Sequence, residues 1–271
     1  MEQNFVIALV LTAIAGLATL LGGFATFLIK KNNLTALSIG MAFSAGVMIF
    51  ISLTELLHEA QSYMSAQHPD LAQLVAYGSF FIGIAIAYVV DFFMPAHIDD
   101  ELCVEMNGCE NPHHPHHHAD KDEIKRAGIL TAFTLSMHRN PEGLAMFFVV
   151  STNLALGIPM AIAIAIHNFP EGIAVALPVY QATGKKRIAI LYSFITTLAG
   201  PLGAIIGFVF LKTLLDETLV GVLFGIVAGI MIYISLDTLL PLARKYGENH
   251  HVIIGIISGM FFIAVSLLLL H

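Results

Sequence analysis

Long apolar stretches dominate this sequence of 271 residues and leave few ways for it to fold in water. A membrane-spanning helix needs about 20 mainly apolar residues, and eight stretches reach that length. Charged residues make up 11% of the chain, whereas a typical soluble domain has about 25%. The sequence therefore predicts an all-α integral membrane protein, folded as a single polytopic membrane domain over residues 1–271. The eight expected helices cover approximately residues 5–29, 34–57, 73–94, 127–150, 155–180, 187–211, 218–242 and 252–270.

Basic residues mark one side of the expected membrane. Ten of the 12 Lys and Arg residues fall in alternate connections, after the first, third, fifth and seventh helices. Because cytoplasmic loops are enriched in Lys and Arg, we expect these connections in the cytoplasm and both termini outside. The cell membrane, meaning the inner or plasma membrane, is the expected location, and the lipid bilayer is the expected surrounding. No nucleic-acid partner is indicated, and the oligomeric state, a homodimer included, is left open.

Two pairs of segments resemble each other across the chain. Ala45–Leu57 and Ala228–Leu240 are identical at nine of thirteen positions, and Leu11–Phe24 also resembles Ile195–Phe208. The paired segments run in opposite directions through the membrane, and the fourth and fifth helices form a third pair. This order predicts a 3+2+3 inverted repeat, which is typical of transporters with a site near the bilayer midplane. Convergent packing of small residues is the alternative explanation.

The third pair carries two polar motifs, HRNPEG at His138–Gly143 and HNFPEG at His167–Gly172. On a helix the spacing of four residues places each histidine and glutamate on one face. Each proline frees a backbone carbonyl beside these polar groups. A buried charge in the membrane costs about 2.5–3.5 kcal/mol, so the two carboxylates need partners. A divalent cation held by His138, Glu142, His167 and Glu171 is one interpretation; protonated glutamates, pairing with Arg139 or a proton relay are the others.

These motifs, the histidine-rich loop and the topology resemble the ZIP (Zrt-, Irt-like) metal transporters, and in particular their bacterial zinc-transporting branches. The resemblance covers essentially the whole chain. It implies uptake of a divalent metal into the cytoplasm by alternating access, one bundle sliding against the other without ATP. Zn²⁺ is the expected substrate, with Fe²⁺, Mn²⁺, Co²⁺ and Cd²⁺ as others, and no organic cofactor is expected.

The resemblance also implies a second, adjacent metal site, from which this sequence departs. Asn168 matches that pattern, and Glu142 and Glu171 are available to both sites. Arg139, however, stands where the family has asparagine, and Gly200 stands where the family has glutamate. Because a guanidinium can replace a cation electrostatically, we expect a single metal, with Arg139 in place of the second. The alternative is that Arg139 extends toward the membrane surface.

Further polar residues lie toward the two ends of the expected helices. At the outer end of the second helix, Glu55, His58 and Glu59 are candidates for attracting incoming cations, or form an ordinary polar helix end. Met48 lies deeper, as a gate residue or as ordinary packing, and Asp91 and Asp237 are candidates for the exit side. The loop at residues 95–123 is expected to capture metal weakly at the cytoplasmic face. Its histidines are His113, His114, His116, His117 and His118.

Two other classes of function compete with metal transport. One is a proton-coupled carrier of a substrate other than a metal. The other is an intramembrane metalloenzyme, although the chain has no HExxH motif: His58 is followed by Glu-Ala-Gln-Ser. Since an inverted repeat favours moving a substrate over cleaving one, the chain is not expected to be an enzyme.

Overall fold

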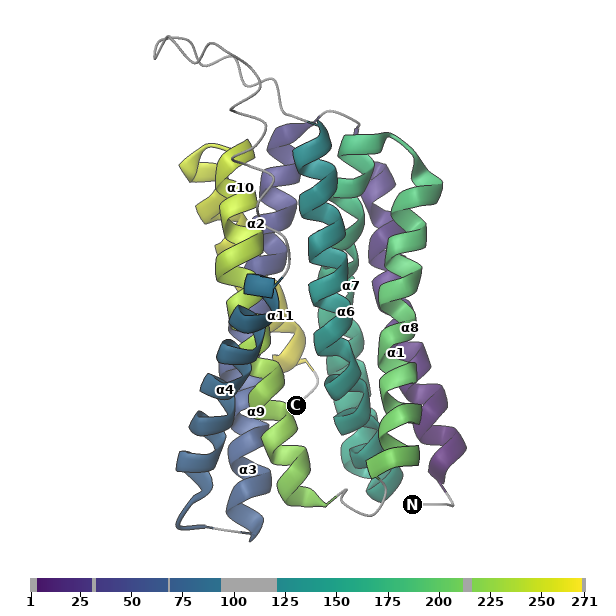
Figure 1. Cartoon of the computed structure of the whole chain (residues 1–271), viewed down its shortest axis with the longest axis vertical. Coiled ribbons are helices and arrows are strands. Elements are labelled where there is room, and N and C mark those ends of the chain that lie inside the picture. Colours follow the sequence, from purple (N-terminus) through teal and green to yellow (C-terminus); the bar gives the residue numbers. More distant parts are fainter. Residues whose placement is uncertain (1–3, 31–32, 68, 94–120, 212–215, 270–271) are drawn as a thin grey trace.

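A computed structural model of the chain describes residues 4–30, 33–67, 69–93, 121–211 and 216–269. Every regular element within these ranges is helical (Figure 1). In chain order the elements are α1 (Phe5–Ala25), η2 (Thr26–Leu28), α2 (Leu34–Ile51), η3 (Ser52–Leu56), α3 (Leu57–Gln67), α4 (Ala72–Phe93), α6 (Lys121–Thr152), α7 (Leu154–Thr183), α8 (Lys186–Leu211), α9 (Glu217–Ile234), η4 (Ser235–Leu239), α10 (Leu240–Tyr246) and α11 (Asn249–Leu268).

Seven helical runs in the described residues are long and apolar enough to cross a membrane. The exception is α6, which has 32 residues but carries the charged and polar side chains of the HRNPEG motif at its middle. Its length matches that of its neighbours (Figure 1), so the polar motif explains why this helix falls below the others in hydropathy. The predicted histidine-rich loop, with His113–His118, lies outside the described residues, except that residues 121–123 begin α6.

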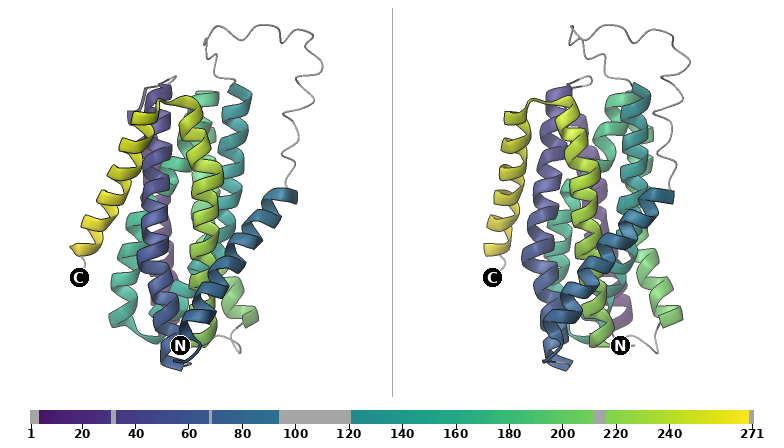
Figure 2. Two further views of the ribbon diagram at one scale, coloured as in Figure 1. Left: turned by 90° about the vertical axis from the view of Figure 1, so that its left-hand side faces the viewer. Right: turned by 60° about the vertical axis from the view of Figure 1, so that its left-hand side comes forward.

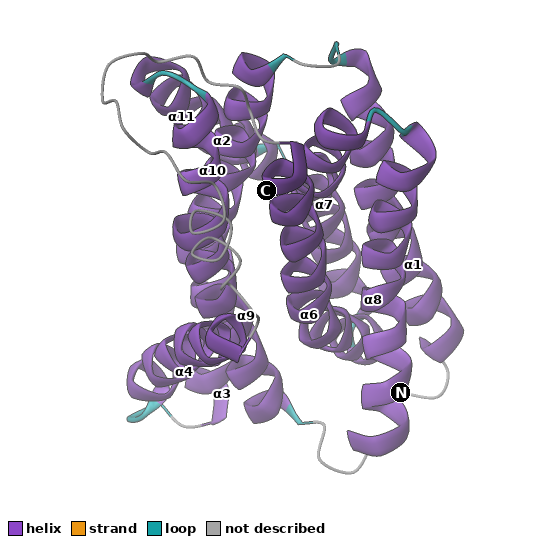
Figure 3. Ribbon diagram, turned by 45° about the horizontal axis from the view of Figure 1, so that its top comes forward, coloured by secondary structure: helices purple, strands orange, loops and turns teal. Residues whose placement is uncertain are grey.

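The helices form two groups, which Figures 1 and 3 show side by side. We call α1, α6, α7 and α8 the motif bundle, because its members contact one another and include both polar motifs. The remaining α-helices form the companion bundle: α2, α3, α4, α9, α10 and α11. Helices α2 and α7 contact each other between the bundles, as do α9 and α6.

Glycines set the closest helix approaches in the companion bundle. A Cβ at Gly46 in α2 would overlap the carbonyl oxygen of Ile256 in α11. A Cβ at Gly229 in α9 would overlap the carbonyl oxygen of Phe80 in α4. Gly46 and Gly229 occupy equivalent positions in the two similar segments. Figure 2 shows the two resulting pairs, with α11 against α2 and α4 crossing α9.

The same two segments also share a local irregularity. Ser52–Leu56 and Ser235–Leu239 each form one π-helical turn, at equivalent positions of the two similar segments. In both turns the first serine donates its hydroxyl to the carbonyl four residues earlier, at 2.6 Å for Ser52 and 2.7 Å for Ser235. Because π-helical turns occur frequently at functional sites, their equivalent positions make both turns candidates for a functional role in the repeat.

Replacing Gly229 by alanine is expected to destabilise the protein, because the new methyl group collides with the α4 backbone rather than with a movable side chain. Such overpacking costs about 1–3 kcal/mol. Gly78→Ala in α4 is the matched control, since a Cβ there meets nothing within 4 Å. Thermal unfolding of the two variants in the same detergent measures the difference, and equal unfolding temperatures would contradict this account of the packing.

Candidate metal centre

Six polar side chains of the two motifs lie deep inside the molecule. His138, Arg139 and Glu142 project from the middle of α6, and their exposed fractions are 0%, 2% and 2%. His167, Asn168 and Glu171 project from the middle of α7, and each is 0% exposed. Burying so many polar groups is costly unless they satisfy one another. The arrangement of their hydrogen bonds therefore determines what this centre can do.

The glycine that ends each motif brings a neighbouring helix against the centre. A Cβ at Gly143 would overlap the carbonyl oxygen of Gly200, and one at Gly172 would overlap that of Thr19. Helix α8 therefore packs directly on the HRNPEG motif, and α1 packs directly on the HNFPEG motif. Both motif prolines lie inside continuous helices. The centre is thus enclosed by four helices of the motif bundle.

Each motif histidine pairs with the glutamate of the other motif. His138 Nε2 lies 3.0 Å from Glu171 Oε1, and His167 Nε2 lies 2.7 Å from Glu142 Oε1. His167 is oriented by its other ring nitrogen, since Nδ1 lies 3.2 Å from the carbonyl oxygen of Ala163. Such second contacts orient metal-binding imidazoles. All four predicted ligand side chains therefore meet at the α6–α7 contact.

Arg139 points into this centre rather than toward the membrane surface. Its Nη1 donates to Thr19 Oγ1 and Asn168 Oδ1, both at 2.7 Å, and to Glu171 Oε2 at 2.8 Å. Glu171 thus has both oxygens engaged, one by His138 and the other by Arg139. Asn168 is the residue that matches the family's second metal site, and its side-chain oxygen accepts a hydrogen bond from the guanidinium.

Two contacts to α1 hold the Arg139 side of the centre, and the sequence reasoning did not include them. Thr19 accepts from Arg139, and the Asn168 amide donates to the carbonyl oxygen of Ala15 at 2.9 Å. A threonine inside an apolar helix gives little signal in a sequence.

Gly200 leaves unfilled space beside Arg139. A Cβ at this position would meet only the Arg139 carbonyl oxygen within 4 Å, at 3.8 Å. A small cavity of about 10 Å³ touches Gly200, Arg139, Glu142 and Asn168. That volume is enough for about one water molecule. The position where the family pattern has glutamate is therefore open in this protein.

In the described part of the chain, no three or more His, Cys, Asp or Glu side chains are arranged to hold a metal ion together. The four predicted ligands are instead tied up in two separate His–Glu hydrogen bonds. A metal entering the centre has to replace both of these contacts. In this form the four side chains make two separate pairs and do not point toward one common position.

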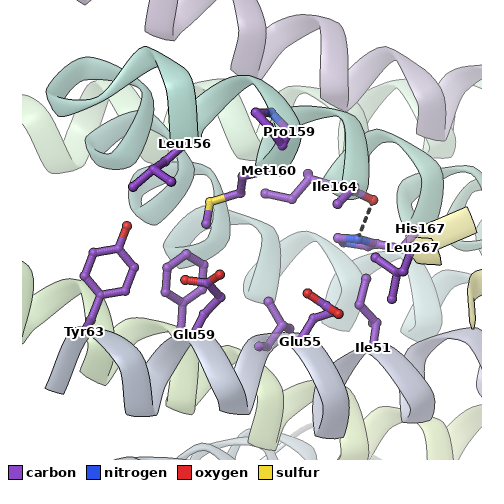
Figure 4. Close-up of a pocket in the computed structure, with 13 residues that line it drawn as sticks. Ile51, Glu55, Glu59, Tyr63, Leu156, Pro159, Met160, Ile164, His167 and Leu267 are labelled. Atoms are coloured by element: carbon purple, nitrogen blue, oxygen red, sulfur yellow. Dashed lines mark hydrogen bonds between the residues drawn. The ribbon is translucent and has the colours of Figure 1, made fainter. Parts of the chain in front are cut away.

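A cavity of about 340 Å³ leads to this centre from the α3 end of the molecule. It lies between α7 and the helical run α2–η3–α3, and Glu55, Glu59, Tyr63, Met160 and His167 are among the residues that line it. Figure 4 shows the carboxylates of Glu55 and Glu59 directed across the cavity toward α7, with His167 at the far end. An ion that enters past these carboxylates reaches His167 before the other motif residues.

The remaining predicted site residues lie elsewhere. His58 is exposed and does not line the cavity, and Met48 is fully buried in the apolar core. Asp91, at the end of α4, accepts a hydrogen bond from the Tyr233 hydroxyl at 3.2 Å, and Asp237 is exposed on η4. Both aspartates lie away from the cavity. The structure thus brings Glu55 and Glu59 to the cavity and leaves His58, Met48, Asp91 and Asp237 outside its lining.

Comparison with known proteins decides the family. The model of the family described as ZIP Zinc transporter matches residues 4–267. The chain belongs to the ZIP family. It is 43% identical to the zinc transporter ZupT of Streptococcus mutans, with 99% of each chain covered, and 43% identical to that of Akkermansia muciniphila, with 98% of each covered. The zinc transporter ZupT of Clostridium perfringens is 42% identical, over 98% of this chain and 97% of the relative.

Membership in this family confirms the resemblance inferred from the two motifs. The protein is a multi-pass, all-helical membrane protein. Its relatives are named transporters rather than enzymes, so the ZIP family assignment removes the metalloenzyme alternative. Zinc is the metal in the printed names of these relatives.

Proposed function

We propose that this ZIP protein carries divalent metal ions, Zn²⁺ above all, across the membrane into the cytoplasm. Fe²⁺, Mn²⁺, Co²⁺ and Cd²⁺ are further substrates in this proposal. The observation that carries it is a cavity lined by two carboxylates that reaches His167, a member of two neighbouring His–Glu pairs. Imidazole nitrogens and carboxylate oxygens are the ligands that Zn²⁺ takes in proteins.

The membrane arrangement in this proposal has eight spans, with α6 as the one whose polar motif lowers its hydropathy. Three matched features of α2–α3 and α9–α10 support an inverted repeat: similar sequences, equivalent glycine contacts and equivalent π-helical turns. The distribution of Lys and Arg supports a cytoplasmic position for the alternate connections and outer positions for both termini. In this orientation the cavity opens to the outside.

The transport site in this proposal binds one metal through His138, Glu142, His167 and Glu171. Arg139 supports a single metal, because its guanidinium already donates hydrogen bonds to the amide oxygen of Asn168 and to one oxygen of Glu171. A second cation placed there would face a permanent positive charge. The neighbouring space at Gly200 offers no carboxylate to offset that repulsion.

Movement of the two bundles supplies the change of access in this proposal. The centre belongs entirely to the motif bundle, whereas Glu55 and Glu59 belong to the companion bundle. Sliding the motif bundle along the companion bundle therefore carries the metal away from the cavity and toward the cytoplasmic face. Such relative motion of two bundles around a site is typical of transporters with internal repeats.

Uptake by the purified protein in liposomes tests the function. Zinc is expected to accumulate inside vesicles that contain the protein and not in empty ones, as measured with an enclosed zinc-sensitive dye. Competition by unlabelled Fe²⁺, Mn²⁺, Co²⁺ and Cd²⁺ then ranks the substrates. Equal zinc entry into empty and protein-containing vesicles would refute the proposal.

The cavity carboxylates give a kinetic prediction. Replacing Glu55 and Glu59 together by glutamine is expected to lower zinc uptake about tenfold at low zinc, because carboxylates in a cleft raise the local concentration of cations. The defect should shrink at saturating zinc, since the ligands of the centre are unchanged. Glu248→Gln is the matched control, because it removes an exposed carboxylate at the start of α11, outside the cavity. An equal loss in the control, or a loss that persists at saturation, would contradict this role.

A further inference from the structure

A buried hydrogen bond joins the two bundles at the HNFPEG motif. Ser44 Oγ in α2 donates to the carbonyl oxygen of Pro170 in α7 at 2.8 Å. Ser44 belongs to the companion bundle and is 0% exposed. Pro170 lies between His167 and Glu171, two of the four proposed metal ligands. The bond therefore ties one bundle to the turn of helix in which the other bundle holds its metal ligands.

The equivalent contact in the other half of the repeat lacks a donor. Alignment of Ala45–Leu57 with Ala228–Leu240 places Val227 opposite Ser44, and alignment of the motifs places Pro141 opposite Pro170. The contact between α2 and α7 thus corresponds to the contact between α9 and α6, both of which are present. Val227 is buried, but its side chain has no group that can donate to a carbonyl oxygen.

The presence of a donor at Ser44 and its absence at Val227 make the two forms of the transporter unequal if the two halves exchange roles during transport. In a protein with inverted repeats, the form that opens to one face and the form that opens to the other are related by exchanging the conformations of the two halves. In the form that opens to the opposite face, α9 then packs against α6 as α2 packs against α7 in the present form. A serine–carbonyl bond forms in the first arrangement, and a valine faces the carbonyl in the second.

We propose that Ser44 acts as a latch that favours the form in which the cavity reaches His167. The proposal rests on the transport function, since it assumes a second form open to the opposite face. The latch lies within one helical turn of His167 and Glu171, so the bond that holds the bundles together is adjacent to the metal. Its loss shifts the balance of the two forms without removing a metal ligand.

The distance between two spin labels measures that balance directly. In a background with Cys103 and Cys109 replaced by serine, cysteines at Ser62 of α3 and Leu156 of α7 carry the labels, because both residues are exposed at the cavity end of the molecule. The open form gives the longer separation and the closed form the shorter one. Because one hydrogen bond is worth a factor of roughly two to ten in an equilibrium, Ser44→Ala is expected to lower the ratio of open to closed forms by that factor.

Ser38→Ala is the matched control. Ser38 is also a buried serine of α2 and donates to the carbonyl oxygen of Ala243 at 2.7 Å, but this partner belongs to the same bundle. The ratio should therefore match that of the wild type. Val227→Ser is the converse variant, because it supplies the missing donor opposite Pro141 and should also lower the ratio.

The outcomes separate the latch from the transport function. An unchanged ratio in Ser44→Ala, or an equal shift in Ser38→Ala, would overturn the latch. A ratio raised by Val227→Ser would overturn it as well, because the two halves would then not exchange roles. Zinc uptake by the wild type in the same liposomes is read independently, and its absence would count against transport whatever the distances show.

Discussion

Replacing His167 by alanine is expected to abolish zinc uptake, with a fall of at least about 100-fold in the rate at low zinc. Mutating the residues that merely orient metal ligands typically costs 10–100-fold, so losing a ligand should cost at least as much. His167 also lines the cavity that leads to the centre, so it is both a ligand and the first contact in this proposal. Uptake into liposomes, measured across a range of zinc concentrations, gives the rate.

Two companion variants make this result specific. His250→Ala removes an exposed histidine at the start of α11 and should leave uptake unchanged. Glu171→Gln keeps the size of the side chain but removes its charge and one of its two acceptor oxygens, and it should also lose uptake. Thermal unfolding checks that each variant is folded. Substantial uptake by a folded His167→Ala variant would remove the centre from the transport path.

The positions of the motifs on adjacent helices were predictable from the sequence, but their pairing was not. The spacing of four residues places His138 above Glu142 on one helix face. In the structure each histidine instead bonds the glutamate of the neighbouring helix. Which groups meet across two helices depends on their relative rotation and axial offset, and the close approaches at Gly143 and Gly172 help to set both. A single helix period carries no information about these quantities.

The helical state of the long apolar segments was predictable for a physical reason, but the two π-helical turns within them were not. A long apolar segment in lipid must satisfy its backbone internally, so its sequence nearly determines its helical state. By contrast, the π-helical turns at Ser52 and Ser235 follow from local backbone bonding that the pattern of apolar residues does not encode. Met48 illustrates the same limit: apolar composition placed it in a helix, but only the packing assigns it to the core rather than to the cavity lining.

A second metal is expected to bind when the two unusual residues of the centre are replaced together. Arg139→Asn removes the guanidinium that occupies Asn168 and Glu171, and Gly200→Glu supplies a carboxylate from α8. Space favours the combination, because the cavity of about 10 Å³ at Gly200 is too small for a glutamate until the arginine side chain is gone. The wild type should then bind one zinc ion per chain and the double variant two, as counted by anomalous scattering and elemental analysis.

The single changes and an uncharged replacement isolate the cause. Arg139→Asn alone breaks a buried ion pair, a change that typically costs about 3–5 kcal/mol, so this variant should unfold at a lower temperature. Gly200→Glu alone should also unfold at a lower temperature, because Arg139 still fills the space that the new side chain needs, and it should still bind one metal. Arg139→Asn with Gly200→Gln has nearly the same shape as the double variant but no added charge, so it should bind one metal too. Two well-occupied central metals in the wild type would refute the substitution of arginine for an ion. One metal in a folded double variant would mean that the lost carboxylate and the gained guanidinium do not by themselves set the number of metals.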